Sequence, residues 1–113
     1  MCRLEQNEEF LNGPYARDVR GRIEEQFDHR GGNQINDIEE MQGMICRIAA
    51  EIFSEELENL TRRHMGNLPE NADMERLNQI AAVAYNAILN IVGQCLTMNE
   101  IKGNMLDAIV NQN

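Results

Sequence analysis

The residues that could bind a metal or act as nucleophiles are few, and they lie far apart in the sequence. Cysteines occur only at positions 2, 46 and 95, and neither His29 nor His64 is close to any of them. A structural zinc site needs four nitrogen or sulfur ligands in closely spaced pairs, so this spacing argues against zinc. An odd number of cysteines in a chain with no sign of secretion also argues against a disulfide framework.

Acid–base and nucleophilic chemistry has equally little support. Carboxylate-bridged metal sites in helical bundles use Glu-x-x-His, and no glutamate lies three residues before either histidine. Glu25 and His29 are four residues apart, which fits an ordinary pair on a helix surface. The single serine, Ser54, lies among glutamates instead of beside a base, as a nucleophile would need. We therefore expect no enzymatic activity, no catalytic residues, no metal and no cofactor.

The balance of charge restricts the classes of partner. The 113 residues include 10 Lys+Arg and 19 Asp+Glu, which gives a formal net charge of -9. Nucleic-acid backbones and anionic membrane surfaces attract Lys and Arg, so we expect neither to bind this chain directly. The first twenty residues are too charged for a signal peptide, and the apolar stretch 80–92 is shorter than the ~20 residues of a membrane span. These features predict a soluble cytoplasmic protein.

Turn signals and apolar periodicity divide the chain into an arm and a helical domain. Residues 1–13 are expected to form a polar N-terminal arm, and residues 14–113 a single domain. Apolar residues recur every fourth position over 14–30 and predict a first helix, which two consecutive glycines end. These apolar residues are Tyr15, Val19, Ile23 and Phe27.

A second helix is predicted to begin near Asn33 or Asn36 and to extend to residue 65, and Asn36 followed by Glu39 matches a start of the capping-box type. Ser54 could instead cap a new helix and split this segment in two. If the helix is unbroken, it would be about 45 Å long, which would make the molecule elongated. Arg62 and Arg63 suit its C-terminal end, because positive charge there complements the helix dipole.

A third helix is predicted from Asp73, its expected N-cap, to Cys95. A fourth helix begins after the capping box Thr97-Met98-Asn99-Glu100. The predicted fold is therefore all-α, a small bundle of about four helices in which the two long central helices form an antiparallel hairpin.

The third helix has an unusually wide apolar arc. Surface helices of small domains are apolar over about 100° of their circumference, whereas this one is apolar over well over half. A single chain could bury this arc by packing its first, second and fourth helices around it. We favour a partner that covers the excess, most simply a second copy in a homodimer, and a heterologous protein otherwise. The residues expected at this protein interface are Leu77, Ile80, Ala84, Ile88, Ile91, Val92, Ile101, Met105 and Ile109.

The acidic excess is concentrated on the second helix. Residues 34–72 contain three basic and eight acidic side chains, and Glu51, Glu55 and Glu58 form one ridge of this helix. An acidic ridge is usually a solubilising face, but it could also bind a basic surface of another protein.

Two hypotheses for function follow. The first is a non-catalytic helical protein–protein interaction module, such as an adaptor, an assembly component or a chaperone-like subunit. It would self-associate or dock through its third and fourth helices. The alternative is a small acidic inhibitor or decoy, of the phage anti-defence or toxin-neutralising type, that blocks a basic site on a target protein.

Overall fold

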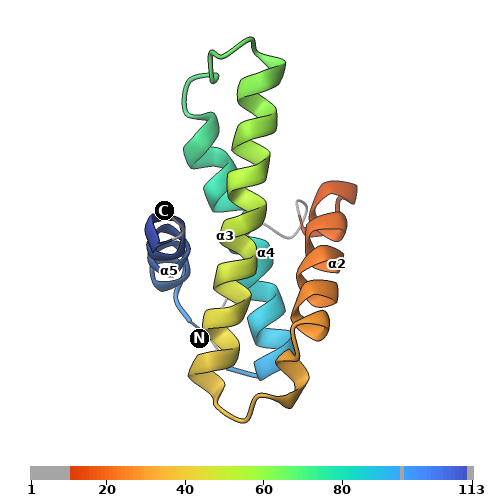
Figure 1. Cartoon of the computed structure of the whole chain (residues 1–113). Helices are drawn as coiled ribbons and strands as arrows, with labels where there is room; N and C mark the ends of the chain where they lie inside the picture. Colours follow the sequence, from red (N-terminus) through yellow and green to blue (C-terminus); the bar gives the residue numbers. More distant parts are fainter. Residues whose placement is uncertain (1–10, 95, 112–113) are drawn as a thin grey trace.

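The described part of the chain is entirely helical. The structure is a computed structural model that describes residues 11–94 and 96–111. These residues contain four long α-helices, α2 (Pro14–His29), α3 (Ile38–Arg63), α4 (Ala72–Val92) and α5 (Met98–Asn111), one short 3-10 helix, η2 (Gly32–Gln34), and no strand (Figure 1). The predicted all-α bundle is confirmed. Most of the predicted N-terminal arm, residues 1–10, lies outside the described residues, as does Cys95.

Helix α2 follows the predicted four-residue pattern. Pro14 lies in its first turn, where its missing N–H costs no hydrogen bond. Val19, Ile23 and Phe27 are buried on one face. The helix ends at His29, and the chain turns through Gly31, whose φ of +79° favours glycine. Gly32 is needed for a different reason, because a Cβ atom there would lie 2.5 Å from the Phe27 ring.

Helix α3 is continuous through Ser54, so the possible break at that residue does not occur. Its N-cap is Asp37, whose carboxylate accepts a 3.2 Å hydrogen bond from the Glu39 N–H. The prediction of Asn36 as the cap was wrong by one residue. The molecule is elongated, with extents of 44 × 34 × 23 Å.

Helix α4 begins at Ala72, whereas an N-cap at Asp73 would make Met74 its first residue. Asn71 precedes its first residue, Ala72, in the left-handed conformation with φ of +62°, and Asp73 lies inside the first turn. The prediction of Asp73 as N-cap was therefore wrong, although its negative charge still suits the helix start. The helix ends at Val92, just before Gly93, whose φ is +78°.

Helix α5 begins as its sequence predicts. The Thr97 N–H donates to Glu100 Oε1, and the Glu100 N–H donates to Thr97 Oγ1, both over 3.1 Å. Two backbone donors at the helix start are thereby satisfied. This capping box therefore sets the residue at which α5 begins.

Helices α3 and α4 form the centre of the bundle, and α2 and α5 each pack against both of them. The chain turns over between α3 and α4, which lie side by side and project beyond the ends of α2 and α5 (Figure 1). One hydrophobic core joins all four helices. One side of α4 is polar, where Gln79, Asn86 and Asn90 retain exposed surface and Asn90 donates to Asn86.

Candidate functional site

Five of the nine predicted interface residues are fully buried by their own chain. Ile80, Ala84 and Ile88 of α4, and Ile101 and Met105 of α5, have no exposed surface. The argument that one short chain could not cover so wide an apolar arc was wrong for these five. Helices α2, α3 and α5 all pack against α4, and one hydrophobic core of the four helices includes these side chains.

The other four predicted interface residues keep part of their surface. Leu77, Ile91 and Val92 of α4 and Ile109 of α5 are half-buried and pack against the core. Only this smaller set could also contact a partner without opening the bundle.

The largest apolar exposure on α5 comes from residues that the sequence analysis did not select. Leu106 is 46% exposed and Val110 is 71% exposed, and they are one helical turn apart. Ile109 lies beside them on the same flank of the helix, whereas Ile101 and Met105 face the core. The sequence did contain a signal for this exposure, because Leu106 and Val110 are apolar but lie outside the apolar stripe of α5 that faces the core.

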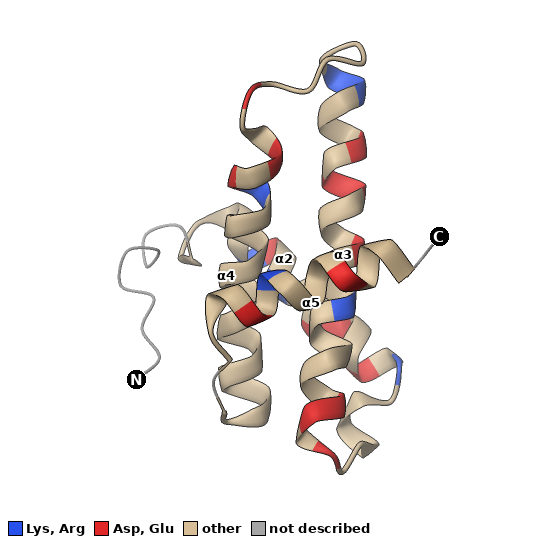
Figure 2. Cartoon of the chain, turned by 90° about the vertical axis from the view of Figure 1, so that its left-hand side faces the viewer, with Lys and Arg blue, Asp and Glu red and all other residues tan. Residues whose placement is uncertain are grey.

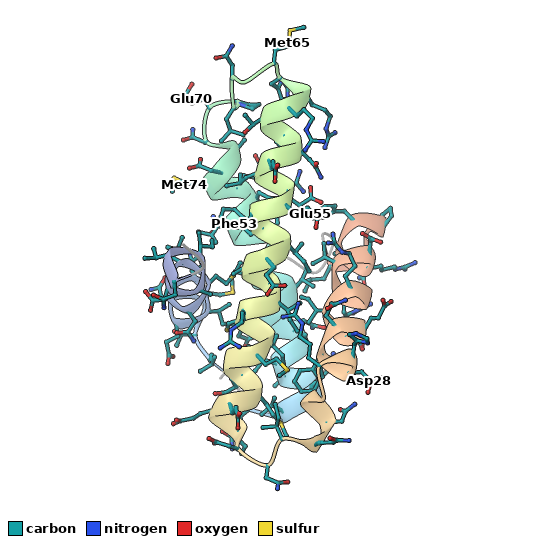
Figure 3. All side chains as sticks on the ribbon, viewed as in Figure 1. Asp28, Phe53, Glu55, Met65, Glu70 and Met74 are labelled. Carbon is teal, nitrogen blue, oxygen red and sulfur yellow. The ribbon has the colours of Figure 1, made fainter. Side chains whose placement is uncertain are left out.

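The start of α5 is linked to α4 by a side-chain hydrogen bond. Lys102 Nζ donates to Asn78 Oδ1 over 3.0 Å. Met74 is one turn before Asn78 on α4. Met74 is 62% exposed, and its side chain points to the side of the molecule that α5 covers lower down (Figure 3).

We call Leu106, Ile109 and Val110 the apolar flank. Figure 2 looks onto this side, where α5 crosses both α3 and α4. The apolar flank belongs to α5 alone, because the second half of this helix runs past α3 and away from the start of α4 (Figure 2). It is therefore the part of the predicted interface region that is accessible in a single folded chain.

The opposite flank of α5 is polar and borders a groove against α3. The groove has a volume of about 420 Å³ and is lined by Gly43, Arg47, Glu51, Asn104, Asp107, Ala108 and Asn111. Asn104 Nδ2 lies 3.8 Å from the sulfur of Cys46, which is buried beneath it. Burial raises the pKa of the Cys46 thiol, so this cysteine stays protonated and unreactive at neutral pH.

The predicted acidic ridge is largely paired within the chain. Arg30 of α2 binds both carboxylate oxygens of Glu51, and Arg22 of α2 binds Glu55 over 2.9 Å. These contacts border a second groove of about 270 Å³ between α2 and α3. Glu58 makes only a loose 3.7 Å contact with Arg62. The three glutamates therefore do not form one surface of unpaired carboxylates.

The described residues offer neither a group of metal ligands nor a helix suited to crossing a membrane. Between residues 11 and 111, leaving out Cys95, no three His, Cys, Asp or Glu side chains are grouped so that they could hold a metal ion. Within the same part of the chain, no helix combines the length and the apolar character that crossing a membrane requires.

Comparison with known proteins adds no relative. Neither the protein-family models, nor the curated protein sequences, nor the solved structures contain a match to this chain.

Proposed function

We propose that the chain is a non-catalytic helical protein–protein interaction module, of the adaptor, assembly or chaperone-like kind. In this proposal α3 and α4 act as a rigid antiparallel hairpin, and the chain docks onto a protein partner through the apolar flank. The partner is a second copy or a different protein. Of the predicted docking region on the third and fourth helices, the proposal keeps the part on the fourth helix that remains accessible.

One observation carries the proposal: apolar side chains one turn apart on α5 keep large exposed surfaces. Single apolar residues are normal on protein surfaces, but apolar side chains grouped on one helix face are typical of an interaction site. Leu106 is 46% exposed and Val110 is 71% exposed. The core below them is complete without them, so their apolar character is not explained by folding.

The alternative, a small acidic inhibitor that blocks a basic site, has less support. Its proposed binding residues are Glu51, Glu55 and Glu58, and the first two already bind arginines of α2. A target would have to compete with these intramolecular ion pairs, which lowers the gain from binding a basic surface.

The test combines light scattering with an apolar fluorescent dye, using the wild-type chain and the variant Leu106→Gln/Val110→Gln. Glutamine keeps good helix propensity, so α5 is expected to remain folded. A control variant, Met65→Asn, removes an apolar side chain that is 93% exposed but lies in the turn after α3. Asparagine also tolerates the positive φ of that position.

The proposal predicts one of two results for the wild-type chain. Either it is a dimer that the Leu106→Gln/Val110→Gln variant dissociates, or it is a monomer whose dye fluorescence falls in that variant. The Met65→Asn control should leave both properties unchanged. A monomer with no dye binding, or with dye binding that is equal in all three proteins, would contradict the proposal.

A further inference from the structure

We propose that Asn12 is a site of spontaneous covalent modification, at which deamidation places a new carboxylate just before helix α2. The product is either aspartate or isoaspartate, in which the main chain runs through the side-chain carbonyl carbon. Three features of the chain carry the proposal: the glycine that follows Asn12, the exposed turn in which Asn12 lies, and the charges at the start of α2.

The reaction needs a backbone nitrogen that can reach the side-chain amide of the preceding residue. The Gly13 nitrogen attacks Cγ of Asn12 and closes a succinimide ring, and its proton leaves with the amide group of Asn12 as ammonia. Water then opens the ring. Attack at the side-chain carbonyl gives aspartate, and attack at the main-chain carbonyl gives isoaspartate. The chain gains one negative charge, and water is the only co-reactant.

The sequence singles out one asparagine for this reaction. Asparagine is among the thermolabile residues of proteins, and Asn12 is the only asparagine of this sequence that is followed by glycine. Glycine has no Cβ and adopts the widest range of backbone angles. Its nitrogen therefore approaches the side chain of the preceding residue with the least steric hindrance.

The structure leaves Asn12 in a suitable place. It is exposed, and it lies in the turn before Pro14, the first residue of α2. Gly13 is the N-cap of α2 and has extended backbone angles, with φ of -78° and ψ of 164°. In an α-helix the repeating backbone angles and hydrogen bonds restrain the nitrogen that would have to attack. Asn12 is outside the helix and is not protected in this way.

Asn71 provides the contrast within the same chain. It is also exposed, and it also lies in a turn just before an α-helix, here α4. The next residue, Ala72, carries a Cβ atom, and its N–H donates to the Pro69 carbonyl over 3.1 Å. The nitrogen that would attack the Asn71 side chain is therefore both hindered and engaged. We expect Asn71 to keep its amide under conditions that convert Asn12.

The start of α2 favours the charge that deamidation creates. Within the described part of the chain, the first turn of α2 has no acidic residue, and its N-cap makes no side-chain hydrogen bond. The first turns of α3, α4 and α5 all contain acidic residues. A carboxylate at residue 12, one position before the N-cap, would lie near the positive end of the α2 dipole. The modified chain should therefore stay folded, with one more negative charge than the present -9.

The experiment incubates the wild-type chain, Asn12→Gln and Gly13→Ala for two weeks at pH 8 and 37 °C. Ion exchange separates the acidic forms, and peptide mapping by mass spectrometry locates them. An isoaspartyl methyltransferase with a labelled methyl donor reports isoaspartate. Glutamine keeps the amide group, but its longer side chain would have to close a larger ring, which forms much more slowly. Circular dichroism checks that each protein stays folded, and Asn71 is the internal control in every sample.

The proposal predicts that residue 12 of the wild-type chain accumulates aspartate and isoaspartate while Asn71 keeps its amide. Residue 12 should stay unmodified in Asn12→Gln, and it should convert several-fold more slowly in Gly13→Ala. The variant Asn12→Asp, which is identical to one product, should unfold at a temperature no lower than the wild type at low salt. Any gain in its unfolding temperature should shrink at high salt.

Three results would overturn the proposal. One is a folded wild-type chain in which residue 12 keeps its amide for the whole incubation. Another is conversion at the same rate in the wild type and Gly13→Ala, because attack by the Gly13 nitrogen would then not limit the reaction. The third is an unfolding temperature of Asn12→Asp below that of the wild type, which would contradict the favourable position of the new charge.

Discussion

Arg30, just after the end of α2, holds Glu51, in the middle of α3, through both of its terminal nitrogens. Arg30 Nη1 donates to Glu51 Oε2 over 3.0 Å, and Nη2 donates to Oε1. The hydrogen bonds to Glu51 raise the pKa of Arg30, which favours the charged form of its guanidinium group. With Arg22 and Glu55, it fastens α2 along α3.

We predict that Glu51→Gln lowers the free energy of unfolding by less than about 1 kcal/mol. About a third of each side chain in this pair is exposed, so solvent screens the interaction. A double-mutant cycle with Arg30→Gln in chemical denaturation measures the coupling between the two residues. The coupling should shrink in 1 M salt. A cycle with no coupling at low salt would show that the pair does not hold α2 to α3.

A second prediction concerns two glycines whose surroundings differ. Gly32→Ala should destabilise the chain by about 1–3 kcal/mol, because the new Cβ would lie 2.5 Å from the Phe27 ring. Gly21→Ala should stabilise it by about 0.5–1 kcal/mol, because Gly21 is inside α2 and a Cβ there meets nothing within 4 Å. Thermal or chemical denaturation of both variants gives the comparison. Equal effects of the two substitutions would contradict the packing of Gly32 on Phe27.

The helix bounds show how far the sequence predicts this fold. The capping box of α5 was predictable because Thr97 and Glu100 satisfy two backbone donors from within four residues. The caps of α3 and α4 were misplaced because several Asn and Asp residues compete at each start, and the selection among them depends on the path of the preceding turn. Asn71 illustrates this, since its positive φ is set by the turn and not by its neighbours in sequence.

The candidate site was harder to predict than the fold, for a reason visible in α4. Periodicity shows how wide an apolar arc is, but it does not show how many neighbouring helices cover it. Ile88 and Leu89 are adjacent and similar in character, yet Ile88 is fully buried and Leu89 is 36% exposed. Which apolar residues become buried depends on how α5 crosses α3 and α4, and the sequence pattern does not show this crossing.

A third prediction uses this adjacent pair. Ile88→Ala should lower the free energy of unfolding by about 2–5 kcal/mol, because it leaves a cavity among three helices. Leu89→Ala should cost less than about 1 kcal/mol, since much of its side chain already contacts solvent. Denaturation at several protein concentrations separates folding from association. An Ile88→Ala variant that keeps its stability but changes its oligomeric state would contradict the burial of Ile88 within one chain.

A fourth prediction concerns alkaline pH. Burial raises the pKa of Cys46 above its ordinary value of 9.0 and that of Tyr15 above 10.0. In both groups the folded state holds the proton more tightly than the unfolded state does. The stability they contribute is therefore fully present below pH 9 and is lost as the pH rises through their folded-state pKa values.

Chemical denaturation between pH 7 and pH 11 tests this prediction. The free energy of unfolding should decline above about pH 9, and the decline should be smaller in a Cys46→Ala variant, which lacks one of the two groups. A free energy of unfolding that rises with pH over this range would contradict the assigned direction. A wild-type chain and a Cys46→Ala variant with the same pH profile would remove Cys46 as a cause.

The account depends most on the apolar flank being the surface where a partner protein binds. Site-specific photo-cross-linking in the cells that make this protein tests it most directly, with the photoreactive side chain placed at Val110, at Leu106, or at the control position Met65. The account predicts one discrete cross-linked protein from positions 110 and 106, and none from position 65. The same products from all three positions, or products from position 65 alone, would contradict it.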